Sequence, residues 1–155
     1  MAAVSGVYNL VRSSVTTSTA ITIQQVTCVA GTMNEFTRHW VNQSTVTTSA
    51  QTRIQFLLKT AVATVTSQTP AILGQGMQAS KSVGGTSATG ITASAEGTDG
   101  AVFNEDGFNI VNGWLLLPVP EERVYVITKS VGLKFPTSPT SAGYVSGQEW
   151  LEYAS

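Results

Sequence analysis

The chain has 155 residues and a formal net charge of −1, and its charged fraction of 11% is less than half of the roughly 25% that is usual in soluble proteins. The near balance of 8 basic and 9 acidic residues leaves no basic surface for phosphates, which argues against nucleic-acid binding. No apolar run approaches the ~20 residues of a membrane-spanning helix, and residues 1–10 lack the pattern of a secretory signal peptide.

Composition favours β-structure. Hydrophobic residues make up 42% of the chain, which is enough to build a core, and Thr and Ser together make up about a quarter. Thr and Val suit a pleated, half-buried surface, whereas helix surfaces favour Lys, Glu, Gln and Ala. The length fits one domain of ordinary size. These features predict a single all-β domain.

Residues 1–14 carry several apolar side chains ahead of the first clear strand pattern: Val4, Val7, Tyr8, Leu10 and Val11. A segment of this kind is poorly ordered unless it docks on something. We interpret residues 1–14 as an N-terminal arm that contacts another subunit, and residues 15–155 as the folded domain. An edge strand of the same domain is an equally good alternative.

Three strands are predicted in the next part of the chain, over residues 19–29, 36–43 and 51–60. In the first, the alternation slips at Gln24–Gln25, which indicates a β-bulge or a corner. The second places Phe36, Arg38 and Trp40 on one face, opposite His39 and Val41. The third is the clearest, because Ile54, Phe56 and Leu58 alternate with the polar Arg53, Gln55 and Lys59.

The middle of the chain shows weaker strand patterns. Residues 61–67 continue as a strand after a bend, and residues 70–80 are irregular. Residues 80–107 are rich in Ser, Thr, Gly and Ala and are predicted to form a long surface loop. This loop carries one weak strand around residues 91–95 and ends in an acidic turn at 96–107.

The last third is predicted to be strand-rich again. A nearly continuous apolar strand spans residues 108–117, a rigid turn follows at 118–122, and shorter strands lie at 123–128 and 133–135, joined by a tight connection. A long strand over 144–153 closes the domain. Eight or nine short strands without a convincing helix predict an antiparallel β-sandwich, jelly-roll-like in architecture. Its expected shared core is Ile54, Phe56, Leu58, Ile110, Val124 and Val126.

The sequence contains few residues that could act in catalysis. His39 is the only histidine and Cys28 the only cysteine; we interpret the first as a packed or surface strand residue and the second as a small core thiol. The glycine-rich segment Gly74–Ala79 imitates a dinucleotide-binding fingerprint but lacks the helix that such a motif requires. We therefore expect no enzyme activity and no cofactor.

The acidic turn offers oxygen ligands that a calcium ion could use: Glu96, Asp99, Asn104, Glu105 and Asp106. Their spacing matches no complete calcium loop, so a solvated turn is the better interpretation and no metal is expected, although the sequence leaves ion binding open. The same acids, or Glu121 with Glu122, could in principle supply a pair of catalytic carboxylates, but nothing in the sequence places them in a groove.

The segment 107–124 resembles part of a known group of proteins. Its Gly-Phe-Asn strand, the following Gly-Trp and the turn Pro118-Val119-Pro120-Glu121-Glu122-Arg123 resemble a pattern in small virion proteins of tailed bacteriophages. The strand at 53–58, and Leu133–Pro136 followed by residues 143–153, resemble other parts of those proteins. The resemblance implies a β-sandwich capsid decoration, or cement, protein.

Such a protein would be a structural virion component that binds the major capsid protein and stabilises the capsid. It would be made in the host cytoplasm and lie on the capsid surface, and a homotrimer would match the threefold positions of a capsid. Interface residues are expected among the apolar side chains of both ends of the chain: Val4, Val7, Tyr8, Leu10, Trp114, Leu116, Tyr144, Trp150 and Tyr153. A receptor- or carbohydrate-binding module of a phage tail or adhesin is the alternative.

Overall fold

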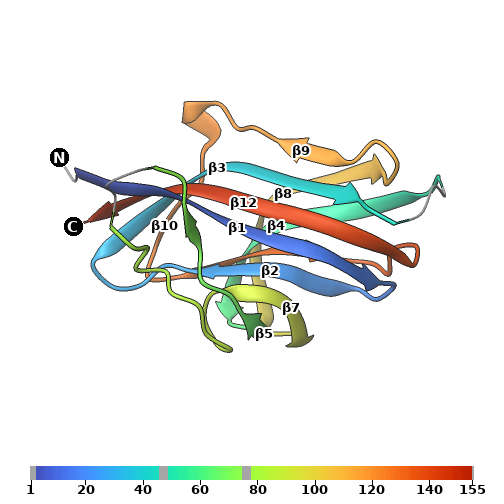
Figure 1. Cartoon of the computed structure of the whole chain (residues 1–155), viewed down its shortest axis with the longest axis horizontal. Coiled ribbons are helices and arrows are strands. Elements are labelled where there is room, and N and C mark those ends of the chain that lie inside the picture. The colour runs from blue at the N-terminus through green and yellow to red at the C-terminus, as the bar shows by residue number, and fades with distance from the viewer. Residues whose placement is uncertain (1–2, 46–48, 75–77, 155) are drawn as a thin grey trace.

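The computed structural model describes residues 3–45, 49–74 and 78–154. The chain forms two six-stranded sheets that pack face to face, as Figure 1 shows. Every pair of neighbouring strands in these sheets is antiparallel. The predicted antiparallel β-sandwich is therefore confirmed.

The first sheet, sheet A, has the order β10-β3-β12-β1-β6, and β9 also pairs with β3. Its strands are β1 (Ala3–Thr17), β3 (Thr32–Gln43), β6 (Ala71–Ile72), β9 (Trp114–Leu116), β10 (Tyr125–Ile127) and β12 (Ala142–Ala154). The long strands β3, β12 and β1 form its centre (Figure 1). A short 3-10 turn, η1 (Pro120–Glu122), lies between β9 and β10.

The second sheet, sheet B, has the order β5-β7-β2-β11-β4-β8. Its strands are β2 (Ile21–Thr27), β4 (Gln51–Ala61), β5 (Thr64–Ser67), β7 (Gly90–Ala95), β8 (Thr98–Asn109) and β11 (Ser130–Phe135). The predicted weak strand at 91–95 is β7. Strand β11 begins in the segment that was expected to be only a tight connection, so this expectation was wrong.

Residues 3–17 are not an arm. They form β1, which pairs along its length with β12 and briefly with β6. The inward side chains Tyr8, Leu10 and Arg12 are each 0% exposed. Tyr8 and Leu10 pack in the core of their own domain, while Val4 and Val11 stay exposed. The interpretation of residues 1–14 as a separate arm is therefore corrected; residues 1–2 lie outside the described residues.

Most of the predicted 80–107 loop is also strand. Residues 98–109, expected as an acidic turn, form β8, the outermost strand of sheet B. Eleven of its twelve residues are exposed or half-buried, and only Phe108 is buried. An edge strand with so little buried surface shows no alternation of apolar and polar residues, which is why the sequence pattern missed it.

The predicted strand 108–117 is two elements. Strand β8 ends at Asn109, and the chain turns through Gly113, whose φ of 71° lies in the left-handed region that favours glycine. Strand β9 then starts at Trp114 and pairs with β3 in sheet A. The apolar run therefore crosses from one sheet to the other instead of lying in one central strand.

Two β-bulges explain where the predicted faces differ. The register between β12 and β3 shifts around Thr37, so Phe36 shares the inner face with His39 and Val41, whereas Arg38 is exposed. The register between β4 and β8 shifts after Phe56. The shift buries Leu57 and Lys59 and leaves Leu58 only half-buried, so Leu58 is not part of the core.

The main core lies between the two sheets. Of the six residues expected there, Ile54, Phe56, Ile110 and Val126 are buried in it, and Val124 packs against it from its rim. Cys28 is buried in the same core, with its Sγ 3.3 Å from the carbonyl oxygen of Thr32, which is the role expected for it.

Candidate functional site

The expected interface residues fall into two groups. Tyr8, Leu10, Tyr144 and Trp150 are each 0% exposed and Trp114 is 6% exposed, so these five belong to the core of the chain and present no surface to a partner. The other four keep some surface: Val4 is exposed, and Val7, Leu116 and Tyr153 are half-buried. Aromatic size alone could not separate the two groups, because large aromatic side chains serve cores and interfaces equally well.

Exposed apolar side chains gather instead on the segment from β9 to β10. We call Leu115, Leu117, Val119, Tyr125 and Ile127 the apolar edge; each is between 51% and 60% exposed. In β10, Tyr125 and Ile127 flank the buried Val126, so both point away from the core.

The register brings these residues together. Strand β9 pairs with residues 39–41 of β3, and β10 pairs with residues 33–35 of the same strand. Both short strands therefore lie along one border of sheet A, with η1 and its flanking loop between them (Figure 1). Two three-residue strands leave much backbone unpaired at this border, and such a border is a site where another chain can add.

A pocket of about 290 Å³ opens beside the apolar edge, between the two sheets. Phe36 and His39 of β3, Phe56 of β4 and Leu116 of β9 form its inner part. The remaining lining residues come from β8 and from the loop around η1: Phe103, Asn104, Pro118, Glu122 and Val124. The pocket enters the sandwich where sheet A is interrupted between β9 and β10.

The inner wall of the pocket is aromatic. The ring centroid of His39 lies 4.0 Å from that of Phe56 and 5.8 Å from that of Phe36. Phe103, which is 39% exposed, continues this wall outward, with its centroid 5.4 Å from that of Phe56. Tilted rings at these separations attract each other beyond the burial of their area.

Two polar groups in this wall lack partners. Neither ring nitrogen of His39, which is 1% exposed, has a hydrogen-bond partner among the described residues, and the same holds for the buried Oδ1 of Asn104. Burial lowers the pKa of His39 to about 3, so its ring is neutral near pH 7 and offers one donor and one acceptor. Most buried polar groups in proteins are paired, so these groups are unusual.

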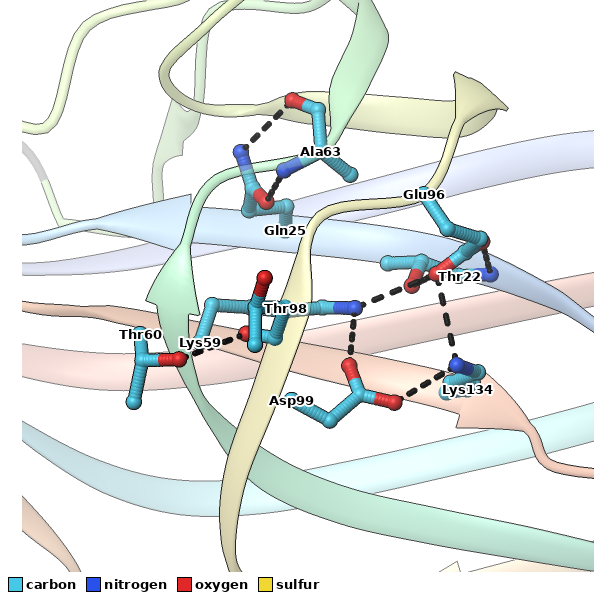
Figure 2. A network of polar contacts seen from close by, with 9 residues as sticks. All are labelled: Thr22, Gln25, Lys59, Thr60, Ala63, Glu96, Thr98, Asp99 and Lys134. Carbon is cyan, nitrogen blue, oxygen red and sulfur yellow. Dashed lines mark hydrogen bonds and ion pairs between the residues drawn. The ribbon is translucent and has the colours of Figure 1, made fainter.

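A second polar site lies at the other end of β8 (Figure 2). The ammonium group of Lys59, whose side chain is 0% exposed, lies 2.5 Å from Asp99 Oδ1 and 3.2 Å from Glu96 Oε2. Lys134 Nζ lies 2.6 Å from Asp99 Oδ2, and Glu96 accepts hydrogen bonds from the backbone and hydroxyl of Thr22. We call Lys59, Glu96, Asp99 and Lys134 the ionic cluster.

The ionic cluster is balanced in charge and internally satisfied. Burial alone would raise the pKa of both carboxyls. Hydrogen bonds from Thr22 and Lys59 outweigh this effect for Glu96, and hydrogen bonds from Lys134 and Lys59 do so for Asp99, so the pKa of each carboxyl lies below its usual value. The acids that were expected in a solvated turn thus fall into two groups. Glu96 and Asp99 hold buried or half-buried lysines, while Glu105 pairs with the exposed Arg53. This arrangement fastens β8 to β4 and β11.

A third polar group lies on β3 and its neighbours. The nearly buried Glu35 accepts hydrogen bonds from Arg123 Nη1, at 2.8 Å, and from the hydroxyl of Tyr153. Burial alone would raise the pKa of Glu35, but these hydrogen bonds lower it overall, and the hydrogen bond to Glu35 raises the pKa of Tyr153 to about 12. The group anchors the chain after η1 to sheet A.

The described residues contain no group of three or more His, Cys, Asp or Glu side chains that could hold a metal ion. Within the same part of the chain, no helix is long and apolar enough to cross a membrane. Of the glycine-rich segment 74–79, residues 75–77 lie outside the described residues.

Comparison with known proteins identified no relative of this chain. The chain matches no protein-family model, no curated protein and no solved structure.

Proposed function

We propose that this chain is a structural virion protein that binds major capsid protein subunits and stabilises a phage capsid. The observation that carries the proposal is the apolar edge, where five large apolar side chains that are more than half exposed lie within thirteen residues of one another. Exposed apolar clusters of this kind mark sites of protein interaction. The proposal also rests on the resemblance of the segment 107–124 to phage decoration proteins, and the apolar edge overlaps that segment.

The charge pattern supports a standing contact between proteins. The apolar edge contains no charged side chain, although Glu121, Glu122 and Arg123 lie between its members. An apolar centre with polar groups beside it is the usual anatomy of a protein interface. Because the net charge is only −1, long-range steering contributes little, and binding should depend weakly on salt.

We further propose that the chain assembles as a homotrimer, in which each copy would place the same surface around a threefold axis. Native mass spectrometry at micromolar concentration tests this proposal. A trimer is the expected species, and a chain that stays monomeric would contradict it.

Co-sedimentation with capsids tests the binding proposal. The probe is empty capsids assembled from the major capsid protein encoded in the genome that carries this gene. Wild-type chain should sediment with them, and the double variant Leu117→Ser with Ile127→Ser should lose most of this binding. Val83→Ser is the matched control, because Val83 is 55% exposed but lies in the segment between β6 and β7. Failure of the wild-type chain to sediment with the capsids would contradict the proposal, and binding to a glycan array would instead favour the carbohydrate-binding alternative.

A further inference from the structure

We propose that the pocket between β3, β4, β8 and β9 binds one phenol ring, either as a small molecule or as the side chain of a tyrosine in a partner. The inference does not depend on capsid binding, because it concerns the pocket of the isolated chain. It rests on the volume of the pocket, on its aromatic wall and on the unpartnered polar groups in that wall.

The size of the pocket suits a ring. Its volume is about 290 Å³, whereas an apolar cavity of about 150 Å³ is enough to take up benzene. The pocket is therefore large enough for a single substituted ring and lies at the small end of the range for ligand sites, about 300–1,000 Å³. Phe36, Phe56 and Phe103 supply faces and edges against which another aromatic ring can pack.

The polar groups specify a hydroxyl on that ring. A neutral imidazole has one donor and one acceptor, and the Oδ1 of Asn104 is an acceptor; all of these lack partners among the residues the structure describes. A phenol hydroxyl can accept from the imidazole N–H and donate to an oxygen or nitrogen acceptor. Toluene, which has nearly the same shape, would leave these buried groups unpaired, and this carries a penalty in binding.

A neighbouring side chain extends this polar region. Gln148 of β12 is the register partner of His39, is 0% exposed, and has no hydrogen-bond partner for either amide atom among the described residues. Two adjacent buried side chains of this kind make the interior next to the pocket polar. Water alone could also pair with such groups, so occupation by water only is one outcome that the experiment must detect.

The mouth of the pocket selects against anions. Glu122 is the one charged residue among the described residues that line it. A carboxylate on the ligand would meet this acid without a lining cation to offset the repulsion. The site should therefore prefer p-cresol to 4-hydroxybenzoate, although both present a phenol ring.

Titration of the full chain with p-cresol and with toluene, followed by amide NMR shifts, tests the proposal. We expect saturable shifts at Phe103, Asn104 and Leu116, with p-cresol bound about five-fold more tightly than toluene, as one hydrogen bond of ordinary strength would give. Affinity for 4-hydroxybenzoate should be lower than for p-cresol. Equal affinities for p-cresol and toluene, or no saturable shift with either because the pocket holds water only, would overturn the proposal.

Variants assign the effect to the pocket. His39→Leu keeps an apolar side chain in place of the ring, so toluene should still bind while the preference for p-cresol falls to near one. If His39→Leu does not fold, Phe103→Ala replaces it, because Phe103 is partly exposed and its loss should weaken both ligands. Trp40→Ala is the control: Trp40 lines a separate pocket with Arg38 and Leu115, and p-cresol affinity should not change. A loss of p-cresol binding in Trp40→Ala, or unchanged binding and preference in the pocket variants, would place the site elsewhere.

The peptides Gly-Tyr-Gly and Gly-Phe-Gly distinguish the two sources of the ring. If the tyrosine peptide binds more tightly than the phenylalanine peptide at the same amides, the pocket accepts a partner's side chain. If only p-cresol binds, the ligand is a small phenol. Either result agrees with a phenol site, and a preference for the phenylalanine peptide would contradict it.

Discussion

At the scale of single residues, the interior of this sandwich contains polar groups that an ordinary apolar core would not. His39 is enclosed by aromatic rings and stays neutral near pH 7, while Arg12, with burial lowering its pKa to about 10, donates hydrogen bonds to Tyr144 and Thr92. A buried charge is destabilising unless it is paired, and a buried imidazole avoids the cost of a charge by staying neutral. Arg12 is the paired case, and His39 is the neutral one.

The burial of His39 should make stability depend on pH. Its folded pKa of about 3 lies below the model-peptide value of 6.5, so the unfolded chain binds more protons and stability is lost as pH falls below 6.5. Between pH 6.5 and 5.5 the free energy of unfolding should fall by about 1 kcal/mol. His39 is the only histidine, so His39→Leu should abolish this slope in urea unfolding; an unchanged slope would show that other groups cause it.

At the scale of elements, the ionic cluster holds the edge strand β8 in place. Asp99 bridges Lys59 of β4 and Lys134 of β11, while Glu96 joins the same lysines to Thr22 of β2. Strand β8 buries little apolar surface along most of its length. Its position therefore depends on backbone pairing with β4 and on these charge-assisted hydrogen bonds.

Removing the charge of Asp99 should destabilise the sandwich. Asp99→Asn leaves the buried Lys59 with only Glu96, and because hydrogen bonds to charged groups contribute about 1.5–3 kcal/mol, we expect a loss of about 2 kcal/mol in the free energy of unfolding. Glu105→Gln is the control on the same strand. Its pair with Arg53 is largely exposed, and such pairs contribute about 0–1 kcal/mol. Equal effects of the two variants in chemical unfolding would contradict the structural role of the ionic cluster.

The turn between β7 and β8 depends on Gly97. A Cβ added there would overlap the carbonyl oxygen of Ala61 and lie 2.5 Å from the carbonyl carbon of Val62, and backbone atoms cannot move aside. Gly97→Ala should therefore lower the melting temperature. Gly107→Ala, near the end of β8, meets nothing closer than 3.9 Å and should be neutral or stabilising by about 0.4–1 kcal/mol; a lower melting temperature for this control would contradict the prediction.

Sequence reasoning succeeded for elements with strong alternation and failed where burial was one-sided or interrupted. Composition and spacing predicted the sandwich, and the alternation at 51–58 located β4. The exposed β8 gave no alternation, and the bulges near Thr37 and after Phe56 moved side chains to the other face. A bulge depends on the partner strand, so one strand's sequence cannot place it.

The candidate site was mostly beyond sequence reasoning for the same reason. His39 was expected to be a packed or surface strand residue with no ligand, because the pocket forms only when four separate segments of the chain meet. The burial of Lys59 and the ends of β1 likewise depend on tertiary contacts. The apolar run at 114–117 was expected to be strand, but only the turn at Gly113 and the pairing with β3 decide which of its side chains are exposed.

At the scale of the whole molecule, the two sheets are fastened by a common core, while one border of sheet A remains apolar and incompletely paired. The proposed contact with capsid subunits lies at this border, and the pocket opens beside it. The opposite border of sheet A is also short, since β6 has only two residues. Its exposed apolar side chains, Val4, Val11, Ile72 and Leu73, are between 38% and 49% exposed, which is less than the 51% to 60% of the apolar edge.

Amide hydrogen exchange of the chain, free and in the presence of the empty capsids named above for co-sedimentation, tests directly whether the apolar edge is the proposed contact. Binding should slow exchange in residues 114–127, where β9, η1 and β10 lie, because their backbone would become paired or shielded. Exchange in β5 (Thr64–Ser67), at the far border of sheet B, should not change. Protection confined to other segments, with unchanged exchange at 114–127, would contradict the proposed contact.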